Sequence, residues 1–236
     1  TCAYTYEIRK MKIAKLAVFF SATILISNAA VAQQALKPQQ RQSQQDQKTF
    51  QAYVPKNYSF FEVVKGDLNK DGVPDAVLIV KATDPKALVK DEYRGTLDRN
   101  RRGIIVLLGQ KDKNTYKQFL QNLNCFSSDQ EDGGVYYPPE LVPEINKGLL
   151  QLTYQHGRYG YWSYKFRLQN QDMRLIGYDQ FSHHGPLLES KTSFNLLTGK
   201  KIYSKNLITD PERNPKYKET HSVHKKSPIY LSKIKD

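Results

Sequence analysis

A short run of alternating oxygen-bearing residues, placed directly before an apolar run, constrains the fold of this chain more than any other feature. Its candidate ligands, at positions 1, 3, 5, 7 and 9, are Asp67, Asn69, Asp71, the Val73 carbonyl and Asp75. Ca²⁺ takes about six to eight oxygen ligands, and oxygen atoms at every second residue of a tight loop are typical of its sites. The spacing therefore predicts a loop that holds a structural Ca²⁺ ion.

The flanks of this loop distinguish it from a helical calcium motif. Gly72 provides the sharp turn, but position 12, a bidentate Glu in an EF-hand, is Leu78. Leu78 lies in the apolar run 76–80, and the run 60–64 before the loop also favours a strand. The context is thus strand, loop, strand. The alternative is an acidic Asx-rich hairpin turn without an ion.

With this spacing, residues 60–81 resemble the FG-GAP/VCBS-type repeat, a calcium-loop unit found in β-propeller blades such as those of integrin alpha subunits. Four later segments resemble a group of uncharacterised secreted bacterial proteins in which one such unit precedes an aromatic-rich β half: 133–135, 154–164, 175–179 and 194–200. This second resemblance covers most of residues 58–205. It implies a β fold and secretion, and it brings no activity or catalytic residues. One departure is Asp132, where these relatives often have Cys.

The N-terminal part predicts export. Residues 1–10 do not begin with Met and are interpreted as an upstream extension or a cloning remnant. Residues 11–32 have a basic start, an apolar centre and a small-residue end, which predicts a signal peptide cleaved after Ala32 and a periplasmic or secreted protein without a transmembrane anchor. Residues 33–52 are rich in Gln and poor in apolar side chains, which predicts a flexible lead.

Residues 53–205 predict a single all-β domain, or one nearly so. Trp162, Tyr164 and Phe166 alternate with polar residues, which indicates a strand with one face in the core. No segment sustains a helical period. We expect antiparallel hairpins that form a sandwich or a partial propeller-like sheet, with the calcium loop between two strands.

The chain is strongly basic, with 36 Lys and Arg against 23 Asp and Glu. Residues 200–236, which include the Pro-containing tail 206–236, hold ten Lys and Arg against four Asp and Glu. Such a tail either binds polyanions or keeps the protein soluble as a solvated segment, and the sequence favours the second interpretation. We expect no nucleic-acid partner. After signal cleavage the only thiol is Cys125, which predicts a free, structural cysteine.

The sequence contains no catalytic motif, so we expect no catalytic residues and no enzymatic activity. Arg158, Tyr159 and Tyr161 form an aromatic patch with a cation, suited to an envelope polysaccharide or a protein partner. The sequence therefore predicts a secreted or periplasmic, non-catalytic binding protein with structural Ca²⁺. The alternatives are a small hydrolase of cell-envelope polymers and a polyanion-binding envelope adaptor that acts through its basic tail.

Overall fold

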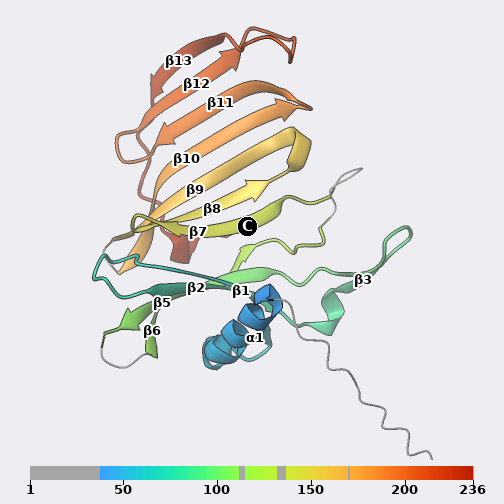
Figure 1. Cartoon of the computed structure of the whole chain (residues 1–236), viewed down its shortest axis with the longest axis vertical. Coiled ribbons are helices and arrows are strands. Elements are labelled where there is room, and N and C mark those ends of the chain that lie inside the picture. The colour runs from blue at the N-terminus through green and yellow to red at the C-terminus, as the bar shows by residue number, and fades with distance from the viewer. Residues whose placement is uncertain (1–37, 112–114, 132–136, 170, 236) are drawn as a thin grey trace, which may run out of the picture. The chain divides into compact units, whose positions relative to one another are not determined.

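The computed structural model describes residues 38–111, 115–131, 137–169 and 171–235, which belong to one compact unit, Lys37–Asp236 (Figure 1). Residues 1–10 and the predicted signal peptide, 11–32, lie outside the described part. Two antiparallel sheets pack on one another, which confirms the prediction of an antiparallel, sandwich-like β fold.

The smaller sheet has four strands in the order β1-β2-β5-β6. These are β1 (Tyr58–Gly66), β2 (Asp75–Ala82), β5 (Arg102–Gln110) and β6 (Thr115–Phe126). Successive side chains of a strand point to opposite faces, and both faces of β2 are buried. Val77 and Ile79 enter a core shared with the larger sheet, whereas Leu78 and Val80 enter a second core that includes Phe50. A continuous apolar run suits a strand that is covered on both faces.

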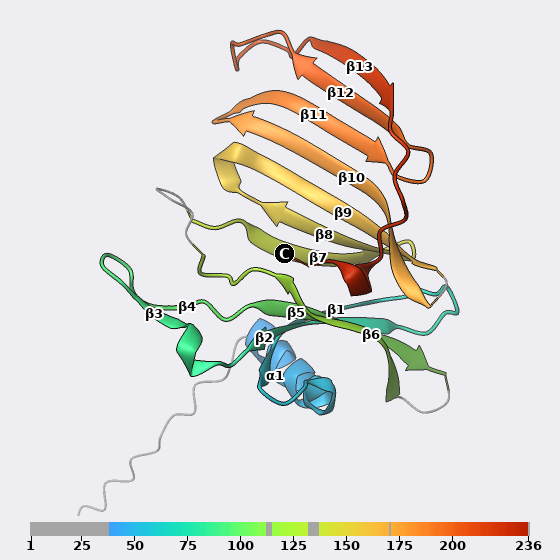
Figure 2. The ribbon, with the colours of Figure 1, turned by 180° about the vertical axis from the view of Figure 1, so that it is seen from behind.

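The larger sheet is a seven-stranded meander whose spatial order is the chain order (Figure 2). Its strands are β7 (Glu140–Asn146), β8 (Leu149–Gln155), β9 (Gly160–Gln169), β10 (Asp172–His184), β11 (Leu187–Asn195), β12 (Lys200–Asn206) and β13 (Tyr217–Val223). The first three of these strands and β10 supply the shared core, for example with Leu150, Phe166 and Met173. The outer strands extend beyond the smaller sheet, so their inner face is not covered by it (Figure 2).

The remaining elements are α1 (Pro38–Phe50), η1 (Gln51–Tyr53), η2 (Pro85–Ala87), β3 (Leu88–Asp91), β4 (Gly95–Asp98), η3 (Gly157–Tyr159) and η4 (Leu231–Lys233). Of these elements, η3 lies between β8 and β9, η4 lies at the chain end, and the others lie around the smaller sheet. Among the described strands, β3 and β4 pair only with each other.

The structure differs from the predicted flexible lead at 33–52, because residues 38–50 form α1. Gln and Lys are good helix formers. The helix is held by its buried last residue, Phe50, and by an ion pair of 2.6 Å between Asp46 and Lys65. Phe50 is completely buried and contacts Tyr53 and Tyr116, with ring centroids 6.4 and 5.1 Å away. The composition of a segment is an average, and it does not reveal that one side chain, such as Phe50, is buried.

The predicted solvated tail at 206–236 is also different in the structure. Residues 217–223 form β13, which pairs with β12, and the chain then returns across the sheet face to η4. Leu231 is fully buried in the shared core, and the Asn122 side-chain amide donates hydrogen bonds of 2.7 Å to the carbonyls of Leu231 and Ile234. We call residues 224–235 the C-terminal strap. Because this segment is rich in Lys, its composition does not indicate that Leu231 is buried.

Candidate functional site

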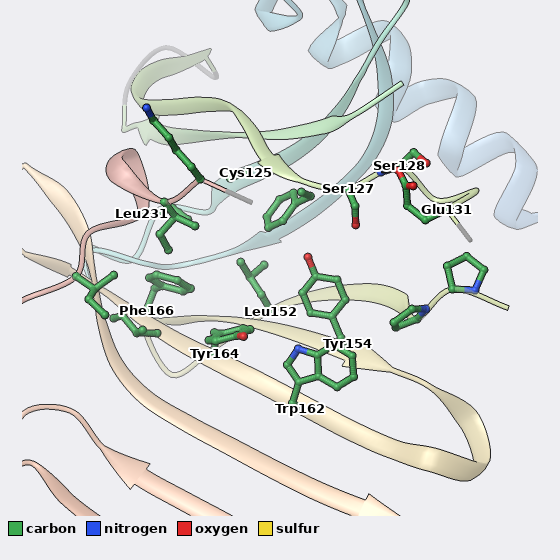
Figure 3. A pocket seen from close by; sticks show the side chains of 17 residues that line it. Cys125, Ser127, Ser128, Glu131, Leu152, Tyr154, Trp162, Tyr164, Phe166 and Leu231 are labelled. Carbon is green, nitrogen blue, oxygen red and sulfur yellow. Dashed lines mark hydrogen bonds between the residues drawn. The ribbon is translucent and has the colours of Figure 1, made fainter. Parts of the chain in front are cut away.

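A cavity of about 520 Å³ lies between the two sheets (Figure 3). Its lining residues come from the end of β6 and the segment after it, from β8 to β10, and from the C-terminal strap. They are Cys125, Phe126, Ser127, Ser128, Glu131, Pro138, Pro139, Leu152, Tyr154, Trp162, Tyr164, Phe166, Leu175, Ile229, Leu231, Ile234 and Lys235. Most of these side chains are apolar or aromatic, and the volume is within the range of small-molecule sites, about 300–1,000 Å³.

The floor of the cavity is built by aromatic residues on neighbouring strands. Tyr154 on β8 lies opposite Trp162 on β9, and their rings stack with centroids 5.3 Å apart and planes 13° apart. In the next row, Leu152 lies opposite Tyr164, whose ring meets that of Tyr178 on β10 at 5.2 Å. Trp162 and Tyr164 are only half-buried. The aromatic rows therefore support one face of an open space.

The roof carries two serines and the carboxylate of the cavity. Ser127 and Ser128 follow β6, and the Ser127 side chain points down toward Tyr154 (Figure 3). Glu131 accepts hydrogen bonds of 2.8 Å from the Ser128 hydroxyl and 2.7 Å from the Arg99 guanidinium. Burial raises the pKa of Glu131, but these hydrogen bonds and the charge of Arg99 outweigh burial and hold that pKa below its usual value. Glu131 is therefore an ionised carboxylate whose oxygens already accept hydrogen bonds from Ser128 and Arg99.

The C-terminal strap forms one wall. The Leu175 backbone amide donates a 2.9 Å hydrogen bond to the Ile229 carbonyl, which ties the strap to β10. The Ser232 hydroxyl donates to the Asp172 carboxylate, and the Ser232 amide donates to the other oxygen of the same group at 3.3 Å. These bonds fix the apolar wall of Ile229, Leu231 and Ile234 across the sheet face.

The predicted calcium loop lies between β1 and β2, as the strand-loop-strand pattern indicated, and Gly66 pairs with Asp75 at its base. Asp75 is fully buried. One of its oxygens accepts from the Leu68 amide at 2.7 Å and from the Asn69 amide at 3.4 Å, and the other accepts from the Gly109 amide at 2.9 Å. Burial is the main reason that the pKa of Asp75 is raised, although these amides lower it. Asp75 thus connects the loop to β5.

The exposed part of the loop is also held by side-chain oxygens that accept from backbone amides. Asp67 accepts from the amides of Asp71 and Gly72 at 3.2 and 2.9 Å, and Asp71 accepts from the Val73 amide at 2.8 Å. The Asn69 amide group donates to Asp71 at 2.8 Å. Lys70, at the tip, has φ 63°, and its side chain lies against Gly148 in the β7–β8 turn.

The chemistry of the donor set fits Ca²⁺, because every candidate ligand is an oxygen atom. The described residues do not, however, contain a group of three His, Cys, Asp or Glu side chains placed to hold a metal ion. The backbone amides of Asp71, Gly72 and Val73 donate four hydrogen bonds to the same side-chain oxygens that an ion would require. Calcium binding therefore stays a prediction, and the buried role of Asp75 stands without it.

The predicted ligand patch is only partly brought together. Arg158 and Tyr159 lie in η3 and line a small hollow of about 370 Å³, where the Arg158 guanidinium lies 5.8 Å from the Tyr159 ring and the His156 ring 5.2 Å from it. Tyr161 does not line this hollow. Its ring stacks on Phe181 with centroids 4.6 Å apart, on the opposite face of the sheet from Trp162.

The cavity itself was not predicted. Alternation placed Trp162, Tyr164 and Phe166 on one face, and that part is confirmed. Phe166 is core, with 1% exposure, but Trp162 and Tyr164 line the open space. The space above Trp162 and Tyr164 is bounded by the C-terminal strap and by the segment after β6. Both are distant from β9 in the sequence, so the alternation within β9 does not predict the cavity.

Comparisons with family models, with curated proteins and with solved structures found no match. Among the helices of the described residues, none has both the length and the apolar character required to cross a membrane.

Proposed function

We propose that this chain is an exported, non-catalytic binding protein that takes an apolar small molecule into the cavity between its two sheets. The single observation that carries the proposal is the cavity of about 520 Å³ above the Tyr154–Trp162 stack. Protein interiors are normally close-packed, so a space of this size lined by aromatic residues has to be explained. Concave, mostly apolar spaces with a few polar groups are typical of small-molecule sites.

The chemistry of the lining favours binding over hydrolysis. A glycosidase-type mechanism requires two carboxyl groups that face one bond. Among the described lining residues of the cavity, Glu131 is the only carboxylate, and Arg99 and Ser128 hold it ionised. A general acid requires the opposite, a carboxyl group whose pKa is raised.

Two further parts of the proposal rest on the sequence. The signal-like segment 11–32 supports export to the periplasm or beyond. The oxygen spacing of the loop that begins at Asp67 supports a structural Ca²⁺ ion, whose binding free energy would add to folding stability. Thermal unfolding with excess Ca²⁺ and with chelator tests the second part. We expect a calcium-dependent rise in Tm that Asp71→Ala removes, and an unchanged Tm would refute it.

The chain offers an internal reporter for the cavity. Trp162 is the only tryptophan in the sequence and lines the cavity floor. N-phenyl-1-naphthylamine is an apolar dye, with a naphthyl and a phenyl group, that absorbs where tryptophan emits. We expect saturable energy transfer from Trp162 to this dye, with a Kd on the order of micromolar, because good ligands of this size gain roughly 0.3–0.5 kcal/mol per atom.

Matched variants locate the bound dye. Ser127→Phe places a phenyl ring in the cavity, and Ser193→Phe makes the same change at an exposed position on the outer face of β11. The first variant is expected to weaken dye binding about tenfold or more, and the second to leave it unchanged. Circular dichroism and thermal melts confirm that both variants fold. Equal dye affinity in the two folded variants would refute the proposed site.

A further inference from the structure

A second hollow, of about 420 Å³, lies beside the cavity on the inner face of the outer strands. It is lined by residues of β9 to β12 and of the C-terminal strap, and it shares Tyr164, Leu175 and Ile229 with the cavity. The two spaces therefore have a common boundary. We call the second space the outer hollow.

The surface of the outer hollow continues the aromatic rows of the cavity. Tyr164, Tyr178 and Phe194 lie opposite one another on β9, β10 and β11, and Lys201 on β12 is the next residue in this row. Residues opposite one another across antiparallel strands share a face. The row thus changes, strand by strand, from aromatic rings to an ammonium group.

The outer hollow is lined by two lysines and one histidine. Lys201 is half-buried, Lys226 is exposed, and the ring of the exposed His224 meets Phe194 edge-on at 6.3 Å. None of its described lining residues is acidic. Within the described part of the chain, neither Lys201 nor Lys226 has an ion-pair partner, whereas Lys81 on β2 and Lys165 on β9 have one or more.

We infer that the ligand is an amphiphile whose apolar body lies in the cavity and whose anionic group lies in the outer hollow, against Lys201 and Lys226. The inference rests on the proposed function, because it assumes that the cavity holds the body. A half-buried cation without a carboxylate partner is a suitable counter-ion for a carboxylate, sulfonate or phosphate.

Two dyes with the same ring system separate the two claims. N-phenyl-1-naphthylamine is neutral, and 1-anilinonaphthalene-8-sulfonate adds one sulfonate group. We expect the sulfonate to bind the wild-type chain more tightly. In the double variant Lys201→Gln, Lys226→Gln, affinity for the sulfonate is expected to fall about three- to tenfold, since each partly exposed charge contributes modestly. Affinity for the neutral dye is expected to stay within about twofold.

The control variant is Lys200→Gln with Lys225→Gln. These lysines are direct neighbours of the first pair and exposed, and they do not line the outer hollow. Net charge changes equally in both variants, so a non-specific charge effect would lower the affinity for the sulfonate equally. That result would overturn the inference, as would equal binding of the two dyes to the wild-type chain.

The test also separates failure of the inference from failure of the proposed function. Absence of binding by the neutral dye overturns the proposed function itself. Binding of the neutral dye without any preference for the sulfonate overturns only the anionic site. Displacement by dodecanoate and by dodecyl phosphate, with dodecanol as the neutral reference, then shows which anionic group the outer hollow prefers. Equal displacement by all three would contradict an anionic site.

Discussion

Replacement of Asp75 by Ala is expected to be among the most damaging single changes in this chain. Asp75 is fully buried, and its two oxygens accept short hydrogen bonds from the amides of Leu68 and Gly109. Alanine leaves both amides without an acceptor in a place that water does not reach. Each unsatisfied buried donor costs about 1–3 kcal/mol, so the expected loss is about 2–6 kcal/mol in the free energy of unfolding.

Urea unfolding in the presence of chelator, followed by circular dichroism and extrapolated to water, measures this loss without any contribution from Ca²⁺. Asp71→Ala is the matched control, because Asp71 is an exposed carboxylate of the same loop whose amide partners can turn to water. Its expected cost is about 0.5 kcal/mol. A loss below about 1 kcal/mol for Asp75→Ala, or equal losses for the two variants, would refute the structural role assigned to Asp75.

Three further outcomes follow from the structure. Burial and the negative charge of Glu140 raise the pKa of Glu62 above its ordinary 4.5, so the folded state binds this proton more tightly than the unfolded state. The protonated Glu62 therefore contributes fully to stability below pH 4.5, and this contribution is lost as pH rises through the raised pKa. Urea titrations at several pH values should show that Glu62→Gln reduces this fall in stability. Leu231→Ala should cost about 2–5 kcal/mol in urea unfolding and open the cavity wall; an unchanged midpoint would show that the strap is not packed. Phe50→Ala should cost about 3–5 kcal/mol and abolish docking of α1, seen as faster amide exchange at Tyr53; unchanged exchange there would contradict that role for Phe50.

The sequence predicts those strands that carry a local signal, whereas β13 lies in a segment predicted to be a solvated tail. The apolar run 76–80 and the alternation around Trp162 both set the period and the buried face. The loop before β2 is delimited equally well, because Gly66 and Asp75 close it as the first pair of a hairpin. Each of these signals extends over about ten residues or fewer, which is the range over which period and turn chemistry act.

The cavity and the C-terminal strap depend instead on contacts distant in sequence. The Asn122 side chain donates a hydrogen bond to the Leu231 carbonyl, 109 positions away, and no local sequence pattern predicts that bond. In the same way, the Gln-rich segment that forms α1 is held by the contact of Phe50 with Tyr116, which is distant in sequence. Composition indicates the average preference of a segment, whereas one buried side chain can determine where the segment lies.

The most direct test of the central claim is a crystal structure of the chain soaked with 1-iodonaphthalene, in which the anomalous signal of iodine locates the ligand without reference to any model. The account predicts a strong iodine peak inside the cavity, beside Trp162 and Tyr154 and beneath Ser127. A cavity that stays free of iodine, or iodine bound only at the exposed Tyr161–Phe181 stack on the other face, would contradict it.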